Sequence, residues 1–244
     1  MPQVKNLRVS GRIGPVIFYY VGDKFYARAA PGKIKQAPKT KIRSTNFGIA
    51  SRAGKALRDG LADVLPNTKD RQMQSRFSGA IAKWLGLQSV KTLTASEQIP
   101  GLYLFMFGGL LPFDQKFHAP FTVSTNGEEA IEIHVPAFVP VKVMNGPRDT
   151  LSVDCTFAVA ACDLATGRPL ENKLVRWNIP YNNDTVPAQT FTLPCAHPPG
   201  SLMIVTGGLR FNALKRGIPV MSEDPSYISC SVIKTVVNVE RVGE

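Results

Sequence analysis

The residues best suited to chemistry in this sequence are four cysteines and three histidines. Cys195 and His197 lie two positions apart, and His134 or Cys155 could complete a metal site with them. Structural zinc sites usually draw their ligands from two closely spaced pairs, and a second pair is missing from this sequence. We therefore expect a proline-flanked loop with incidental polar residues, with no bound metal and no cofactor.

Covalent and acid–base catalysis are not indicated either. The sequence lacks a G-x-S-x-G motif, and Cys162 and Cys230 have no histidine close to them along the chain. Glu128, Glu129 and Glu132 follow an Asn-Gly turn signal and are typical of a solvated turn. The glycine-rich segments lack the Lys-Ser/Thr of a phosphate-binding loop. The sequence predicts a protein that is not an enzyme, with reduced cysteines packed as small apolar residues.

Positive charge is concentrated towards the N-terminus of a chain whose net charge is +11. Of the 29 Lys and Arg residues, 13 lie within residues 1–58, where Asp23 is the only acidic residue. Such asymmetry indicates a surface for a polyanion or an acidic protein, although a merely solvated basic face is the alternative. The predicted partner-binding cations are Lys33, Lys35, Lys39, Lys41, Arg43, Arg52, Lys55 and Arg58.

Aromatic residues beside these cations form the second part of the predicted site. Phe18, Tyr20 and Phe25 lie in two alternating segments joined by Gly22 and Asp23, a typical hairpin turn. We expect these three aromatics to pack against a partner, although they would also serve as the packing face of the hairpin itself. Because aromatic rings beside cations can stack on bases, nucleic acid is the second choice of partner.

The pattern of the chain changes twice and predicts an α+β fold. Residues 1–43 predict a basic β-hairpin followed by an extended arm, and residues 44–86 predict a helical hairpin. Its first helix is expected to begin at Ser44 or Thr45, and its second to run from about residue 68 to 85. The apolar stripe predicted for the first helix comprises Phe47, Ala50, Gly54, Leu57, Leu61 and either Val64 or Leu65.

Residues 101–244 predict an antiparallel β-sandwich with Greek-key-like connections. The clearest strand, at residues 151–159, alternates between apolar and small or polar side chains. Further strands are expected at 130–135, 174–179, 190–193, 202–209 and 228–239, with turn formers and no crossover helices between them. No apolar stretch is long enough to cross a membrane, so we expect a cytoplasmic protein without a membrane partner.

Glycines, prolines and apolar residues recur in several segments: 11–19 (GRIGPVIFY), 27–28, 47–58, 134–140 (HVPAFVP), 208–211 and 231–239. Together these segments resemble a protein family of Bacteroidota genomes and their mobile elements. The residues that carry the resemblance are structural, and no activity is established for such proteins, which look like phage-type structural components.

The combined expectation is a non-enzymatic structural or assembly subunit of a phage-like particle, either a virion or a contractile injection system. It would form a homo-oligomer and dock on other structural proteins of the particle through its basic N-terminal region. The rival hypothesis is a nucleic-acid-binding accessory protein, and a third is a carbohydrate- or surface-binding module.

Overall fold

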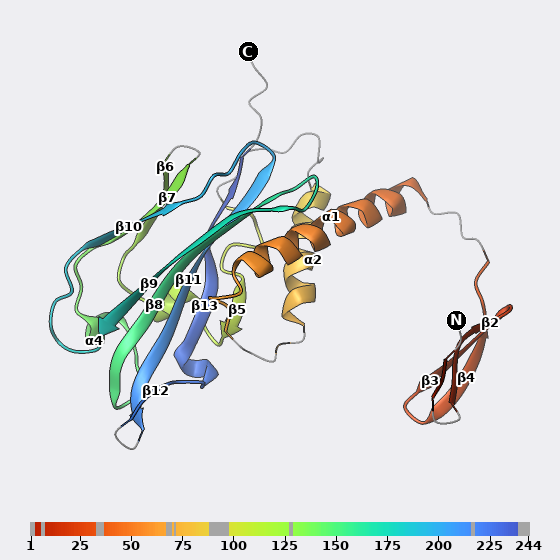
Figure 1. Ribbon diagram of the computed structural model, residues 1–244, viewed down its shortest axis with the longest axis horizontal. Coiled ribbons are helices and arrows are strands. Elements are labelled where there is room, and N and C mark those ends of the chain that lie inside the picture. Colours follow the sequence, from red (N-terminus) through yellow and green to blue (C-terminus); the bar gives the residue numbers. More distant parts are fainter. Residues whose placement is uncertain are drawn as a thin grey trace, which may run out of the picture. The chain divides into compact units, whose positions relative to one another are not determined.

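The computed structural model describes residues 3–5, 8–32, 37–66, 70, 72–87, 98–126, 129–215 and 218–238. The chain divides into two compact units, Met1–Ile42 and Arg43–Glu244, which we call the N-terminal unit and the body (Figure 1). The fold is α+β with antiparallel sheets, as the sequence predicts.

The N-terminal unit contains a four-stranded antiparallel sheet in which consecutive strands are neighbours. Its strands are β1 (Gln3–Lys5), β2 (Arg8–Ile13), β3 (Val16–Val21) and β4 (Lys24–Ala29). The two-residue turns after β2 and β3 begin with Gly14 (φ +56°) and Gly22 (φ +61°). Glycine adopts this left-handed backbone without the steric cost of a side chain, which explains why the predicted hairpin forms here.

Helix α1 (Pro38–Gly60) begins earlier than the sequence predicts. The carbonyl of Ala37 accepts hydrogen bonds from the amides of Thr40 and Lys41 (2.9 and 3.1 Å), so residues 38–43 of the predicted extended arm are helical. Proline suits the first position of a helix, because its missing N–H needs no partner there. The rest of α1 was predicted from its apolar stripe. Residues 38–43 carry no such stripe, so no pattern in the sequence indicated that they are helical.

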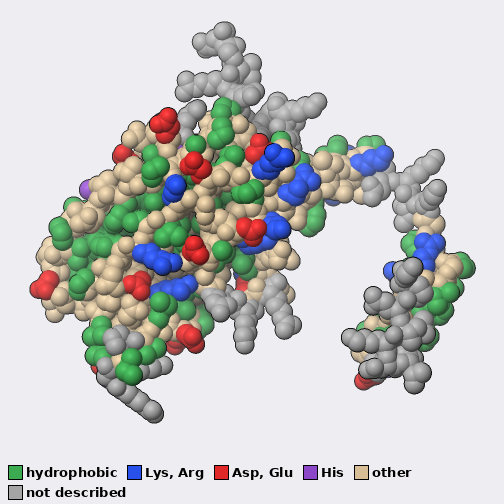
Figure 2. All heavy atoms as spheres, in the orientation of Figure 1, with side chains coloured by type: hydrophobic (Ala, Val, Ile, Leu, Met, Phe, Trp, Pro, Cys, Tyr) green, Lys and Arg blue, Asp and Glu red, His purple; other side chains and the backbone are tan. Residues whose placement is uncertain are grey.

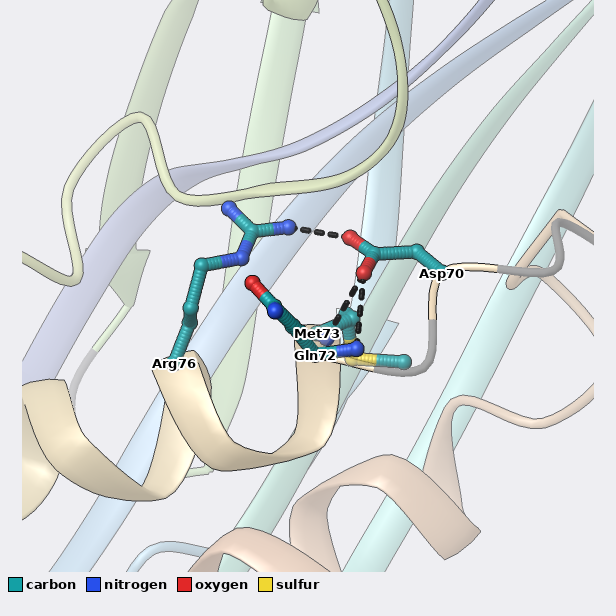
Figure 3. A network of polar contacts seen from close by, with 4 residues as sticks. All are labelled: Asp70, Gln72, Met73 and Arg76. Atoms are coloured by element: carbon teal, nitrogen blue, oxygen red, sulfur yellow. Dashed lines mark hydrogen bonds and ion pairs between the residues drawn. The ribbon is translucent and has the colours of Figure 1, made fainter. Parts of the chain in front are cut away.

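Helix α2 (Met73–Leu87) begins later than predicted, because Asp70 caps it. One carboxylate oxygen of Asp70 accepts from the amides of Gln72 and Met73 (2.9 and 3.0 Å), and the other pairs with Arg76 (Figure 3). A capping carboxylate accepts hydrogen bonds from amides that have no partner within the helix. Its negative charge also interacts favourably with the positive end of the helix dipole.

The strands of the body form two further antiparallel sheets. The larger sheet has the order β5-β13-β11-β8-β9, with β12 paired to β11, and the smaller has the order β10-β7-β6. The larger sheet comprises β5 (Met106–Gly109), β8 (Thr150–Asp163), β9 (Pro169–Pro180), β11 (Ser201–Lys215), β12 (Ile218–Met221) and β13 (Ile228–Val237). The smaller comprises β6 (Thr122–Asn126), β7 (Ala130–Val135) and β10 (Gln189–Pro194), and the short helices are α3 (Phe113–Lys116), α4 (Pro140–Val143) and η1 (Pro225–Tyr227).

Two apolar cores cover the two faces of the larger sheet. The helix core lies between that sheet and helices α1 and α2, and the sandwich core lies between the larger and smaller sheets (Figure 1). Along β8, Ala158 and Ala160 belong to the helix core, whereas Phe157 and Val159 belong to the sandwich core. The middle of β8 is therefore buried on both faces, and its alternating side chains serve different cores.

Close packing in the sandwich core depends on a glycine in β11. A Cβ atom at Gly207 would lie 2.6 Å from the ring of Phe113, which is fully buried. The Phe113 ring in turn makes an edge contact with that of Phe157, with 5.6 Å between the ring centroids. Any side chain at position 207 would have to displace this aromatic cluster.

Hydroxyl groups of β13 hold the segment that precedes the sandwich. The amide of Ile99 donates to Thr235 Oγ1 (2.7 Å), and the amide of Phe113 donates to Ser231 Oγ (2.8 Å). Ser229 Oγ donates to the carbonyl of Leu111 in the same segment (3.0 Å). These bonds satisfy buried backbone groups that lie outside regular strand pairing.

The helices and the sandwich share one compact unit, which begins at Arg43. Most of the predicted α1 stripe is buried in the helix core, but Phe47 is 57 % exposed and lies outside both cores. The predicted boundary at residues 86–101 falls largely on residues 88–97, outside the described residues. None of the helices in the described ranges is long and apolar enough to span a membrane.

Candidate functional site

One face of the N-terminal sheet brings the three predicted aromatics together. Phe18 and Phe25 stack with ring centroids 5.6 Å apart, and Tyr20 lies 5.1 Å from Phe25. The pairing register places Ile13 and Val16 on the same face, which we call the aromatic face. Phe25 is 51 % exposed, and neither apolar core includes a residue of the N-terminal unit.

The opposite face, which we call the tyrosine–arginine face, was not singled out by the sequence. Tyr19 and Tyr26 are directly opposite each other on β3 and β4, and their rings stack at 5.6 Å. The guanidinium of Arg28 lies 5.7 Å from the centre of the Tyr19 ring. Because side chains alternate along a strand, Lys24 shares this face with Tyr26 and Arg28. The alternation Lys-Phe-Tyr-Ala-Arg at 24–28 is the sequence signal that would have identified it.

The predicted cations within the described residues are spread along helix α1. Lys39, Lys41 and Arg43 are exposed in the first turns of α1, and Arg52 and Lys55 are exposed further along it. Side chains of Lys and Arg are visible along α1 in Figure 2, whereas over the sheets they are interspersed with Asp and Glu. Lys33 and Lys35, also predicted to bind a partner, lie outside the described residues.

Arg58 is not the freely exposed cation that the sequence predicts. Its side chain is half-buried, and its Nη1 atom is buried without a hydrogen-bond partner. Burial lowers the pKa of the Arg58 guanidinium, against the opposing effect of Asp59. Arg58 therefore belongs partly to the packing of α1 against the body.

The cysteines and histidines do not assemble into a reactive site. Burial raises the pKa of the thiols of Cys162 and Cys230 to about 12 and that of Cys195 to about 11, so they stay protonated near neutral pH. His197 Nδ1 contacts the backbone oxygen of Cys195 (3.0 Å) rather than its thiol. Among the residues described, no three His, Cys, Asp or Glu side chains lie close enough to hold a metal ion.

The body also holds a polar cavity of about 330 Å³ that sequence analysis did not foresee. Asp114 and Lys234 line it, and Lys234 Nζ donates to the carbonyl of Val123 (3.0 Å). Oδ1 of Asp114 is buried with no hydrogen-bond partner, and Leu104, also in the lining, has a positive φ of 60°. A β-bulge shifts the alternation of β13 just before Lys234, and such a shift leaves no signal in the sequence.

Comparison with protein-family models, with curated proteins and with solved structures finds no match to this chain. Evidence for function therefore comes from the geometry of the chain itself. The N-terminal sheet is the most informative feature, because it presents two chemically different faces and none of its described residues belongs to an apolar core.

Proposed function

We propose that this chain is a non-enzymatic structural subunit of a phage-like particle, either a virion or a contractile injection system. Its N-terminal unit would join it to a neighbouring copy of the same chain. The observation that carries the proposal is the aromatic face, on which Phe18, Tyr20 and Phe25 lie together with Phe25 half exposed. A small sheet with an exposed apolar face is stabilised when that face packs against another layer.

The distribution of charge supports a second copy as the partner. Arg12, Lys24 and Arg28 lie on the tyrosine–arginine face, so two aromatic faces can meet without burying any of these cations. Sheets pack face to face at about 10 Å, and the same patch on both copies gives a two-fold, self-complementary interface. Each N-terminal sheet would supply half of a small intermolecular sandwich.

The body supports the structural role because it is a complete folded unit. Both faces of its larger sheet are covered by apolar cores, and its four cysteines are buried. Protonated, buried thiols are poor nucleophiles, which favours a binding role over catalysis. The resemblance to phage-type structural components is the basis for naming the kind of particle.

Light scattering coupled to size-exclusion chromatography at micromolar concentrations tests this proposal. We expect the full chain to self-associate, and the double variant Phe18→Ser/Phe25→Ser to be monomeric. The matched control is Tyr19→Ser/Tyr26→Ser, which removes two rings from the other face of the same strands and should still associate. A wild-type chain that stays monomeric throughout this range would contradict the proposal.

A further inference from the structure

The tyrosine–arginine face presents a pair of accessible aromatic rings. Tyr19 and Tyr26 are 37 % and 41 % exposed, and their ring planes are within 21° of parallel. The two tyrosines lie on adjacent strands. Because β4 is the outermost strand of the sheet, the Tyr26 ring is exposed at the edge of the sheet. Every nucleobase has a flat π-face, so exposed rings of this kind stack on bases with little preference for sequence.

Cations flank the two rings in a regular array. On β4, Lys24 and Arg28 stand on either side of Tyr26, each about 6.8 Å away along the strand because alternate residues share a face. Ile17 of β3 is paired with Arg28 on one side and with Arg12 of β2 on the other. Arg12 Nε donates to the carbonyl of Gly14 (2.9 Å), which holds its guanidinium near the turn.

The surroundings of this array add almost no negative charge. Residues 1–42 contain nine Lys and Arg, and Asp23 is their only acidic residue. Asp23 lies in the turn between β3 and β4 and not on the tyrosine–arginine face. The face is therefore complementary in charge to a polyanion, and its rings lie between the cations.

We infer that the tyrosine–arginine face binds single-stranded nucleic acid. Bases would stack on Tyr19 and Tyr26, and the phosphates would lie against Arg12, Lys24 and Arg28. The exposed rings favour a single strand over a duplex, since the bases of a duplex are already stacked on one another and only their edges are accessible. They also favour nucleic acid over an acidic protein, which would engage the cations but has no use for a stacking surface.

This inference goes beyond the proposed function and does not depend on it. Self-association uses the aromatic face, whereas the strand would bind the opposite face of the same sheet. In a particle, two packed N-terminal units would direct their cations outwards, and a bound strand would neutralise them.

Fluorescence anisotropy with the full chain tests the inference. The probes are a labelled oligothymidine of about 20 nucleotides, a duplex of equal length and heparin as a polyanion without bases. At about physiological salt we expect the single strand to bind at least about tenfold more tightly than the duplex. Equal affinity for all three probes would overturn the inference, because it would show that only charge is recognised.

Two double variants separate stacking from charge. Tyr19→Leu/Tyr26→Leu should weaken binding of the single strand by about tenfold or more, and Tyr19→Phe/Tyr26→Phe, which keeps the rings, should bind like wild type. Arg12→Gln/Arg28→Gln should reduce the slope of log K against log salt by about 1.4, since each neutralised phosphate of a single strand contributes about 0.7. The control Lys39→Gln/Lys55→Gln removes equal charge from α1 and should change the slope less.

Two results would count against the inference. One is an unchanged affinity in the leucine variant, and the other is binding to poly-glutamate without binding to the oligothymidine. Light scattering on the same variants keeps the two proposals apart. A leucine variant that self-associates but does not bind the strand supports both, whereas a monomeric wild type that binds the strand contradicts only the proposed function.

Discussion

The N-terminal sheet and the larger sheet of the body are both antiparallel, yet they are stabilised in different ways. In the body, Phe157 on β8 and Phe211 on β11 are completely buried, and helices or a second sheet cover each face. In the N-terminal unit every residue of β4 is exposed. Strands of the same geometry are thus covered on both faces in one region and left exposed in the other, and this difference is the basis of our proposal that the N-terminal sheet binds other molecules.

Limited proteolysis should reveal this difference most strongly. We expect trypsin to cut first within residues 30–43, where exposed Lys39, Lys41 and Arg43 lie, and to leave the body intact because its sheets pack on two apolar cores. Mass spectrometry of the early fragments is the measurement. A first cut within residues 150–180 would show that the body is the less stable region.

Truncating a core ring should destabilise the body far more than truncating a ring of the aromatic face. Phe157→Ala removes a fully buried ring that contacts Phe113 and Phe191, and we expect it to lower the free energy of unfolding by about 3–5 kcal/mol. Phe25→Ala should leave the unfolding transition of the body unchanged. Urea denaturation followed by tryptophan fluorescence measures both, since Trp84 and Trp177 are in the body. Equal losses would mean that the two regions unfold together.

A methyl group added in the body should be costly where packing is tight and favourable where space is open. Gly207→Ala places a Cβ against the ring of Phe113, so we expect a loss of about 1–3 kcal/mol. Its control, Gly79→Ala in α2, has no atom within 4 Å of the new Cβ and should gain about 0.5–1 kcal/mol, because alanine favours a helix. Thermal denaturation measures the direction of the stability change in each variant. If Gly207→Ala left the stability unchanged, the sandwich core would be more loosely packed than the geometry implies.

The smallest expected effect is a pH dependence at the start of α2. Hydrogen bonds from the amide of Gln72 and from Arg76 lower the pKa of Asp70. A carboxylate with a lowered pKa contributes stability above its unfolded pKa of about 3.9, and this contribution is lost as the pH falls through the folded pKa. The wild type should therefore melt above Asp70→Asn at neutral pH, and the difference should close below about pH 4. A constant difference would mean that the charge of Asp70 does not matter.

Sequence analysis predicted most of the fold where local signals determine it. Gly22 marks the turn between β3 and β4, and alternation marks residues 151–159 of β8. The same local pattern placed Phe18, Tyr20 and Phe25 on strands, and their common face follows from the pairing of Tyr20 with Phe25. Expectations of this kind succeed because they need only the period of the side chains and the conformational preference of glycine.

Features that depend on distant contacts were not predictable. Phe47 fits the helical stripe of α1 but is exposed, since the stripe only reveals a common face and not what covers it. Arg58 is partly desolvated by packing that no local pattern encodes. Lys234 reaches the carbonyl of Val123 only because a bulge shifts β13 by one residue.

The position of β13 in the larger sheet has a consequence for synthesis on the ribosome. This strand lies between β5 and β11, and its hydroxyls hold the backbone of Ile99 and Phe113, yet it is made after every other strand described. The body therefore cannot close until residues 228–237 have emerged. The N-terminal sheet consists of consecutive hairpins with short-range pairing, which fold quickly. A nascent chain can thus pair the strands of its N-terminal sheet while the body is still open.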